Sequence, residues 1–189
     1  MKYCAGRERE LGYLSLQDEL LRLRLNGRAN DAQFAQNPLP VARAVGRALG
    51  VLHGSSAPDG LEPRTDSEAS AALAIVRSGA TPPSPFSRVR HETLAAILQN
   101  RPSDLPWVLT HGAPVVGAAV LVDSVVTFDD AHTWGLDPAE RDLAIAIRSI
   151  AETFTSEVAA TFLDGYVEEG GRLPHGPTLD WYGVVAAFR

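Results

Sequence analysis

The sequence contains very little cysteine and lysine, and it has no long apolar run. Its single cysteine, Cys4, cannot form an internal disulfide bond or a thiolate metal cage, which is typical of proteins from a reducing compartment. No apolar stretch approaches the roughly 20 residues that a membrane-spanning helix needs. The first residues also lack the apolar segment of a signal peptide. We therefore expect a cytoplasmic protein with no membrane partner.

Positive charge is scarce as well. Lys2 is the only lysine, and the formal net charge is -6. Nucleic-acid binding depends on clustered lysine and arginine side chains that displace counterions from the phosphates. The arginines of this chain are instead scattered along predicted helices, where a solvated helix face is their ordinary place. The charge pattern therefore argues against a nucleic-acid partner.

The length and the composition fit one soluble domain. A chain of 189 residues can bury a substantial core, and 45% hydrophobic with 21% charged residues is an ordinary balance for a globular protein. The 13 prolines and 16 glycines predict several loops between packed segments.

Apolar residues recur at helical spacing along much of the chain. Ser15 as N-cap, followed by a run of leucines, predicts a first helix that ends near residues 26–27. Asp137 as N-cap, with Pro138 at the first helical position, predicts a strong helix in the last third of the chain. Further helices are predicted over residues 40–53, 67–77, 88–100, 156–169 and 178–188.

The centre of the sequence has a different pattern. Residues 107–110 form a strand-like run of Trp, Val, Leu and Thr, which His111 and Gly112 interrupt. An apolar run over residues 115–122, a turn at residues 123–124 and a second apolar run over residues 125–128 then predict a β-hairpin. Such a hairpin among helices favours a functional site nearby.

This central region resembles the aminoglycoside phosphotransferases and their choline-kinase-like relatives. The matching segments are Val-Leu-Thr-His-Gly-Ala over residues 108–113, Leu-Val-Asp over 121–123, Phe-Asp-Asp over 128–130, and Gly-Leu-Asp-Pro-Ala-Glu-Arg-Asp-Leu over 135–143. Upstream, Leu52-His53 resembles the Leu-His that ends a helix in the same family. The resemblance implies an α+β, mainly helical fold of protein-kinase-like type. Residues 39–189 would form the carboxy-terminal lobe with its central hairpin, and residues 1–38 would be a remnant of a reduced or missing amino-terminal lobe.

The resemblance also indicates where the chemistry of this family has been lost. Family members have an Asp that orients the acceptor hydroxyl where this chain has Ala113, and an Asn that binds magnesium where it has Ala118 or Ala119. A methyl group neither accepts a proton nor ligates a hard cation. We therefore expect no catalytic residue at these positions.

Several weaker site candidates remain. Asp129 matches the family's metal-binding Asp and Asp130 follows it, so this pair is the candidate magnesium ligand set. The resemblance also implies two cofactor-binding residues: Lys2 as the lysine that binds the nucleotide phosphates, and Glu19 as its partner on the following helix. We expect no cofactor, although the resemblance allows ATP and magnesium.

The remaining candidates are expected to support the loop. We interpret His111 as a structural residue under the loop, with direct catalysis as the weaker alternative. Asp137 and Asp142 are expected to brace the same loop. His53, His91, His132 and His175 have no partner at metal-ligand spacing and are expected to be ordinary.

Three functional interpretations follow from the resemblance. In the first, the chain is a degenerate kinase that acts as a binding or accessory subunit, in the setting of a bacterial biosynthetic complex. In the second, it is an atypical active phosphotransferase that acts on a small molecule or peptide, with Asp129 or Asp130 and a partner-supplied lobe. In the third, it is a relic or a fragment of a longer gene. The expected partners are a protein or a second copy over the missing lobe, and a small molecule or peptide in the cleft.

Overall fold

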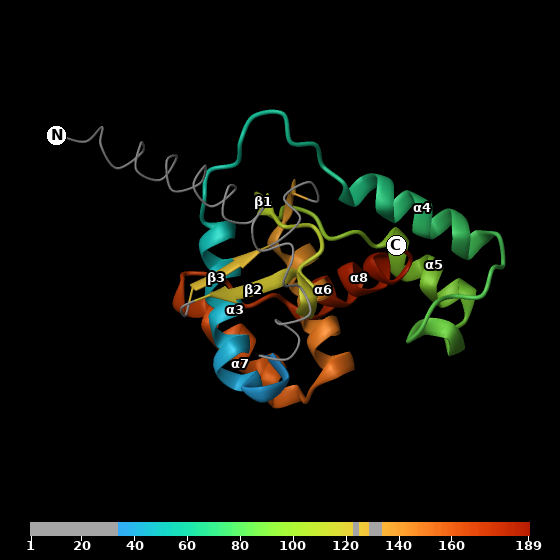
Figure 1. Cartoon of the computed structure of the whole chain (residues 1–189). Coiled ribbons are helices and arrows are strands. Elements are labelled where there is room, and N and C mark those ends of the chain that lie inside the picture. Colours follow the sequence, from blue (N-terminus) through green and yellow to red (C-terminus); the bar gives the residue numbers. More distant parts are fainter. Residues whose placement is uncertain (1–33, 123–124, 129–133) are drawn as a thin grey trace.

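The computed structural model describes residues 34–122, 125–128 and 134–189, and these residues form a mainly helical fold with short strands (Figure 1). The mainly helical α+β prediction is confirmed. The helix predicted after Ser15 lies outside the described residues. The six described α-helices are α3 (Pro38–His53), α4 (Thr65–Arg77), α5 (His91–Gln99), α6 (Ala139–Thr153), α7 (Ser156–Glu168) and α8 (Gly176–Ala187).

The strands form two separate antiparallel pairs. The predicted hairpin is present as β2 (Ala119–Val122) and β3 (Val125–Phe128). The predicted strand β1 (Trp107–Thr110) pairs with β4 (Gly135–Pro138), a strand that the sequence pattern did not predict. Since β4 is only four residues long and contains Gly and Pro, it has no alternating apolar pattern to reveal it.

The expectation that Asp137 is the N-cap of the next helix is wrong. Pro138 occupies the N-cap position of α6, and no side chain caps that helix. Asp137 is instead paired with Val108 in the β1–β4 ladder. Asp137 therefore belongs to strand β4, although the local sequence pattern predicted it as the N-cap of the following helix.

Helices α3 and α7 pack in direct backbone contact. An added Cβ at Gly46 would lie 2.0 Å from the carbonyl oxygen of Phe162, and one at Gly165 would lie 2.1 Å from that of Arg43. Any larger residue at these two glycines would force the helices apart. The first core cluster lies between these helices, the strands and α6, around Leu49, Phe162 and the other apolar side chains of this region.

A second core cluster lies on the other side of the molecule. It joins α4, α5 and α8 through buried residues that include Leu94, Trp181 and Val184. Helices α6 and α8 lie between the α3–α7 pair and the α4–α5 pair (Figure 1). None of the helices in the described part of the chain is both long enough and apolar enough to cross a membrane.

Candidate functional site

The candidate site is the loop that follows β1, and the carboxylate of Asp142 holds it in place. Oδ2 of Asp142 accepts the backbone N–H of His111 at 2.6 Å, and Oδ1 accepts the backbone N–H of Gly112 at 2.9 Å. Asp142 lies in the first turn of α6 and is completely buried, like His111. Buried N–H groups in a loop need such partners because no water reaches them. The start of α6 therefore fixes the backbone of the loop.

Asp142 also has a side-chain partner, the imidazole of His53 at the end of α3. Nε2 of His53 lies 3.3 Å from Oδ2 of Asp142, and Nδ1 of His53 lies 3.0 Å from the hydroxyl of Tyr166 in α7. A carboxylate only accepts, so Nε2 of His53 donates to Asp142, and the hydroxyl of Tyr166 is the hydrogen-bond partner of Nδ1. Burial raises the pKa of Tyr166 to about 12, so the phenol stays protonated and can donate.

The surroundings of Asp142 determine its charge. Burial alone would raise the pKa of this carboxyl group, but the hydrogen bond and charge of His53, followed by the charges of Arg141 and His111, outweigh burial and hold the pKa below its usual value. The lowered pKa keeps Asp142 ionised, and an ionised carboxylate is the stronger acceptor for the two loop N–H groups.

The carbonyl group of Gly112 accepts from two arginines. Nη1 of Arg141 donates to this oxygen at 2.9 Å, and Nη1 of Arg189 donates to it at 2.6 Å. The carboxylate of Glu68 in α4 contacts both arginines: it binds Nε and Nη2 of Arg141 at 3.1 and 2.6 Å and lies 3.4 Å from Nε of Arg189. Gly112 has a φ of 90°, a conformation that glycine adopts without strain. The loop is thereby connected to α4, α6 and the residues after α8.

Asp137 reaches a different element from Asp142. Its Oδ1 accepts the backbone N–H of Thr65 at 2.9 Å and the hydroxyl of Thr65 at 2.6 Å, and it also accepts the backbone N–H of Arg64 at 3.2 Å. These donors lie at the amino-terminal end of α4, where unpaired N–H groups and the helix dipole favour a negative charge. Asp137 therefore attaches the amino-terminal end of α4 to β4, so its support of the loop is indirect.

Three alanines lie on and beside this loop. Ala113 is half-buried, and its backbone N–H points to Nδ1 of His111 at 3.3 Å. The ring of His111 lies against Phe128, with 5.0 Å between the ring centroids. Ala118 ends a short 3-10 turn, Val116–Ala118, and Ala119 begins β2. These positions present methyl groups where the resemblance expects an Asp and an Asn.

The other predicted site residues fall outside the described residues: Lys2, Glu19, Asp129 and Asp130. Among residues 34–122, 125–128 and 134–189, no group of three or more His, Cys, Asp or Glu side chains could hold a metal ion.

Sequence reasoning missed several residues of the site. The expectation that His53 is ordinary is wrong, because it is buried and bound to Asp142. Its position directly after Leu52, at the end of an apolar helix face, was the available signal. Glu68, Arg141 and Arg189 gave no comparable signal, since charged residues on helices ordinarily face solvent.

Comparison with solved structures shows the same fold. An aminoglycoside-3'-phosphotransferase of type VIII has a TM-score of 0.68 and 22% identity, over 82% of this chain and 62% of that one. A choline/ethanolamine kinase family protein from Mesorhizobium loti has a TM-score of 0.60 and 19% identity, over 83% of this chain and 52% of that one. A macrolide 2'-phosphotransferase from Brachybacterium faecium has a TM-score of 0.56 and 23% identity, over 78% of this chain and 51% of that one.

The chain thus spans between 51% and 62% of the length of these structures. None of the curated proteins matches it. The family model described as the phosphotransferase enzyme family matches residues 7–177, which is most of the sequence. With the kinase-like fold and the loop after β1 in view, this match shows that the chain belongs to the phosphotransferase enzyme family.

Proposed function

We propose that this chain is a degenerate member of the family that does not transfer phosphate on its own and acts as a binding or accessory subunit. The observation that carries the proposal is the methyl group of Ala113 on a loop whose backbone is still held by Asp142. Phosphoryl transfer to a hydroxyl needs a group that orients and deprotonates the acceptor. The loop keeps its support but lacks that group.

The residues around the loop also fit a magnesium nucleotide poorly. Magnesium takes oxygen ligands in near-octahedral geometry, and neither Ala118 nor Ala119 offers a side-chain oxygen. The carbonyl oxygen of Gly112 is already bound by Arg141 and Arg189. The residues of the loop therefore do not supply the ligands that a magnesium nucleotide needs.

The loop is better suited to apolar recognition. Pro114 is buried, Val116 is half-buried and packs against the first core cluster, and Val115 is 44% exposed. Apolar side chains with a few fixed polar groups are the usual lining of a binding cleft. We propose a small molecule or peptide as the ligand here, and a protein partner or second copy beside it, in the setting of a bacterial biosynthetic complex.

Calorimetry with magnesium and ATP on the purified chain tests the proposal. We expect no heat of binding and no ATP hydrolysis. The double variant Ala113→Asp with Ala118→Asn then tests whether these two side chains are sufficient to restore phosphoryl transfer. The double variant Ala113→Asn with Ala118→Asn is the matched control without the new carboxylate. Turnover by the chain as it stands, removed by Asp129→Asn or by Asp130→Asn, would contradict the proposal and support the atypical active phosphotransferase instead.

Association is measured separately. We expect sedimentation to show self-association at high concentration, or a pull-down to recover a specific protein partner. A clean monomer with no partner in either experiment would contradict the accessory role.

A further inference from the structure

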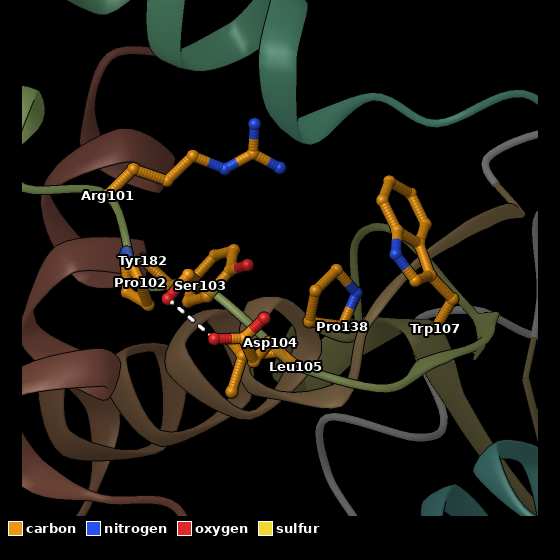
Figure 2. Close-up of a pocket in the computed structure, with 8 residues that line it drawn as sticks. All are labelled: Arg101, Pro102, Ser103, Asp104, Leu105, Trp107, Pro138 and Tyr182. Carbon is orange, nitrogen blue, oxygen red and sulfur yellow. Dashed lines mark hydrogen bonds between the residues drawn. The ribbon is translucent and has the colours of Figure 1, made fainter.

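A pocket of about 270 Å³ lies beside Trp107 and Pro138 (Figure 2). Its lining comes from the segment between α5 and β1, from the first residue of β1, from the end of β4 and from α8: Arg101, Pro102, Ser103, Asp104, Leu105, Trp107, Pro138 and Tyr182. Trp107 begins β1, whereas His111 follows the end of that strand. A strand rises about 3.3 Å per residue, so the pocket and the loop lie at opposite ends of β1.

One face of the pocket is apolar and partly open. Trp107 is 46% exposed, which is unusual for a residue with so large an apolar side chain. Pro138 is its partner in the β1–β4 ladder, so the proline ring and the indole lie near each other on this side (Figure 2). Tyr182 is buried, and burial raises the pKa of its phenol well above the usual value. These groups give a ligand a neutral apolar surface.

The two charged side chains at the rim of the pocket differ in whether they have an ion-pair partner. Arg101 extends toward α4 and is bound to the carboxylate of Asp66 (Figure 2). Asp104 accepts a hydrogen bond from the hydroxyl of Ser103 at 3.0 Å. Within the described ranges, no arginine or histidine forms an ion pair with Asp104. The arginine of the pocket is therefore already neutralised by a neighbour outside it, and the aspartate is not.

A carboxylate without a cationic partner beside an exposed indole is a suitable environment for a positive charge. The face of an indole ring attracts cations through its quadrupole, and the attraction adds to that of a nearby carboxylate. The net charge of -6 on the whole chain acts in the same direction. An anion would have to displace Asp66 from Arg101 and would also meet Asp104.

We propose that this pocket binds a small organic ammonium ion, with its charge facing Asp104 and its apolar body on Trp107 and Pro138. The volume of about 270 Å³ lies just below the usual range for drug-sized ligands. The ligand is accordingly an amine with a compact aliphatic or aromatic body. The proposal does not depend on the loop that follows β1, and it holds whether or not the chain transfers phosphate.

Three probes of similar shape test the sign of the charge: 2-phenylethylammonium, 2-phenylethanol and 3-phenylpropanoate. Binding to the full chain is followed by the NMR signal of the Trp107 indole N–H, which is assigned by its loss in Trp107→Leu. We expect the ammonium ion to bind about three- to five-fold more tightly than the alcohol, as for one exposed ion pair. We expect the anion to bind most weakly, and added salt to reduce the preference for the cation.

Variants of Asp104 and Trp107 then test which residue of the pocket causes the preference for the ammonium ion. Asp104→Asn should weaken binding of the ammonium ion about three- to five-fold and leave the alcohol unchanged. Asp59→Asn removes the same charge from an exposed loop outside the pocket and should change neither. Trp107→Leu should weaken both probes, with the melting temperature as the check on folding. Equal binding of all three probes, tighter binding of the anion, equal effects of the two Asp variants or no binding at all would each overturn the proposal.

Discussion

His53 and Asp142 are 89 positions apart in the sequence, and the imidazole Nε2 of one lies 3.3 Å from the carboxylate Oδ2 of the other in the buried interior. The contact joins the end of α3 to the first turn of α6, where Asp142 also holds the backbone of the loop. A buried carboxylate needs such partners, because its desolvation is compensated only by hydrogen bonds and opposite charge. The position of the loop therefore depends on helices that do not belong to it.

The first prediction concerns His53. His53→Ala should lower the free energy of unfolding by about 3 kcal/mol, because it leaves a buried carboxylate and a buried tyrosine hydroxyl without this partner. Urea unfolding measures the change. His175→Ala is the matched control, since His175 is exposed and its side chain does not cap α8. Equal stability of the two variants would show that the His53 contact contributes nothing.

The second prediction is a pH dependence that arises from Asp142. Its folded-state pKa is lowered, so its contribution to stability is fully present above the unfolded-state pKa of about 3.9 and is lost as the pH falls through the folded-state pKa. Urea unfolding between about pH 3 and pH 6 should therefore show a loss of stability on acidification.

The variant Asp142→Asn measures how much of the loss of stability on acidification arises from Asp142. The variant should be less stable than the parent by about 3 kcal/mol near neutral pH, and the difference should shrink below about pH 4. Asp59→Asn, at an exposed position, should retain the parent's slope. A stability difference between the parent and the Asp142→Asn variant that stays constant down to the lowest pH would refute the assignment.

The third prediction separates a hydrogen bond from packing at Thr65, which is completely buried. Its hydroxyl donates to Oδ1 of Asp137 at 2.6 Å. Thr65→Val keeps the side-chain volume and loses the donor to a charged acceptor, at a cost of about 2 kcal/mol. Thr65→Ser keeps the donor and loses one methyl group, which should cost about 1 kcal/mol. If the Ser variant unfolds at lower urea than the Val variant, packing rather than the bond to Asp137 is what Thr65 supplies.

The fourth prediction uses two glycines in helices. Gly46→Ala should destabilise the protein by about 3 kcal/mol, because the new methyl group would meet the backbone oxygen of Phe162. Gly183 in α8 has open space at the same position, so Gly183→Ala should stabilise the protein by up to about 1 kcal/mol through helix propensity. Thermal melting of both variants checks the opposite signs; a shift in the same direction for both would contradict the close contact of α3 and α7.

Local patterns in the sequence were sufficient for most of the helices. The helix predicted over 156–169 is present as α7, which ends at Glu168, and the one predicted over 67–77 begins two residues earlier, at Thr65. That earlier start has a physical cause outside the helix, because Asp137 accepts the N–H and hydroxyl groups of Thr65. Asp137 lies 72 positions away, so no local pattern could show it.

The site was only partly predictable for the same reason. The resemblance placed Ala113 and Asp142 near one loop, since those positions lie in recognisable segments. The partners of the loop come from α3, α4 and α6 and from Arg189, which follows the end of α8. Hydrogen bonds between charged side chains far apart in the sequence have no periodicity. Glu68, Arg141 and Arg189 follow from the tertiary structure alone.

The backbone N–H groups of His111 and Gly112 lie in a loop, where amide hydrogens usually exchange with solvent within short times. Both are bound to a buried carboxylate whose other partners come from α3 and α6. Breaking those bonds requires these helices to separate, so the two amides should exchange only when the whole fold opens. Their exchange rates would then report the global stability of the protein from within its candidate functional loop.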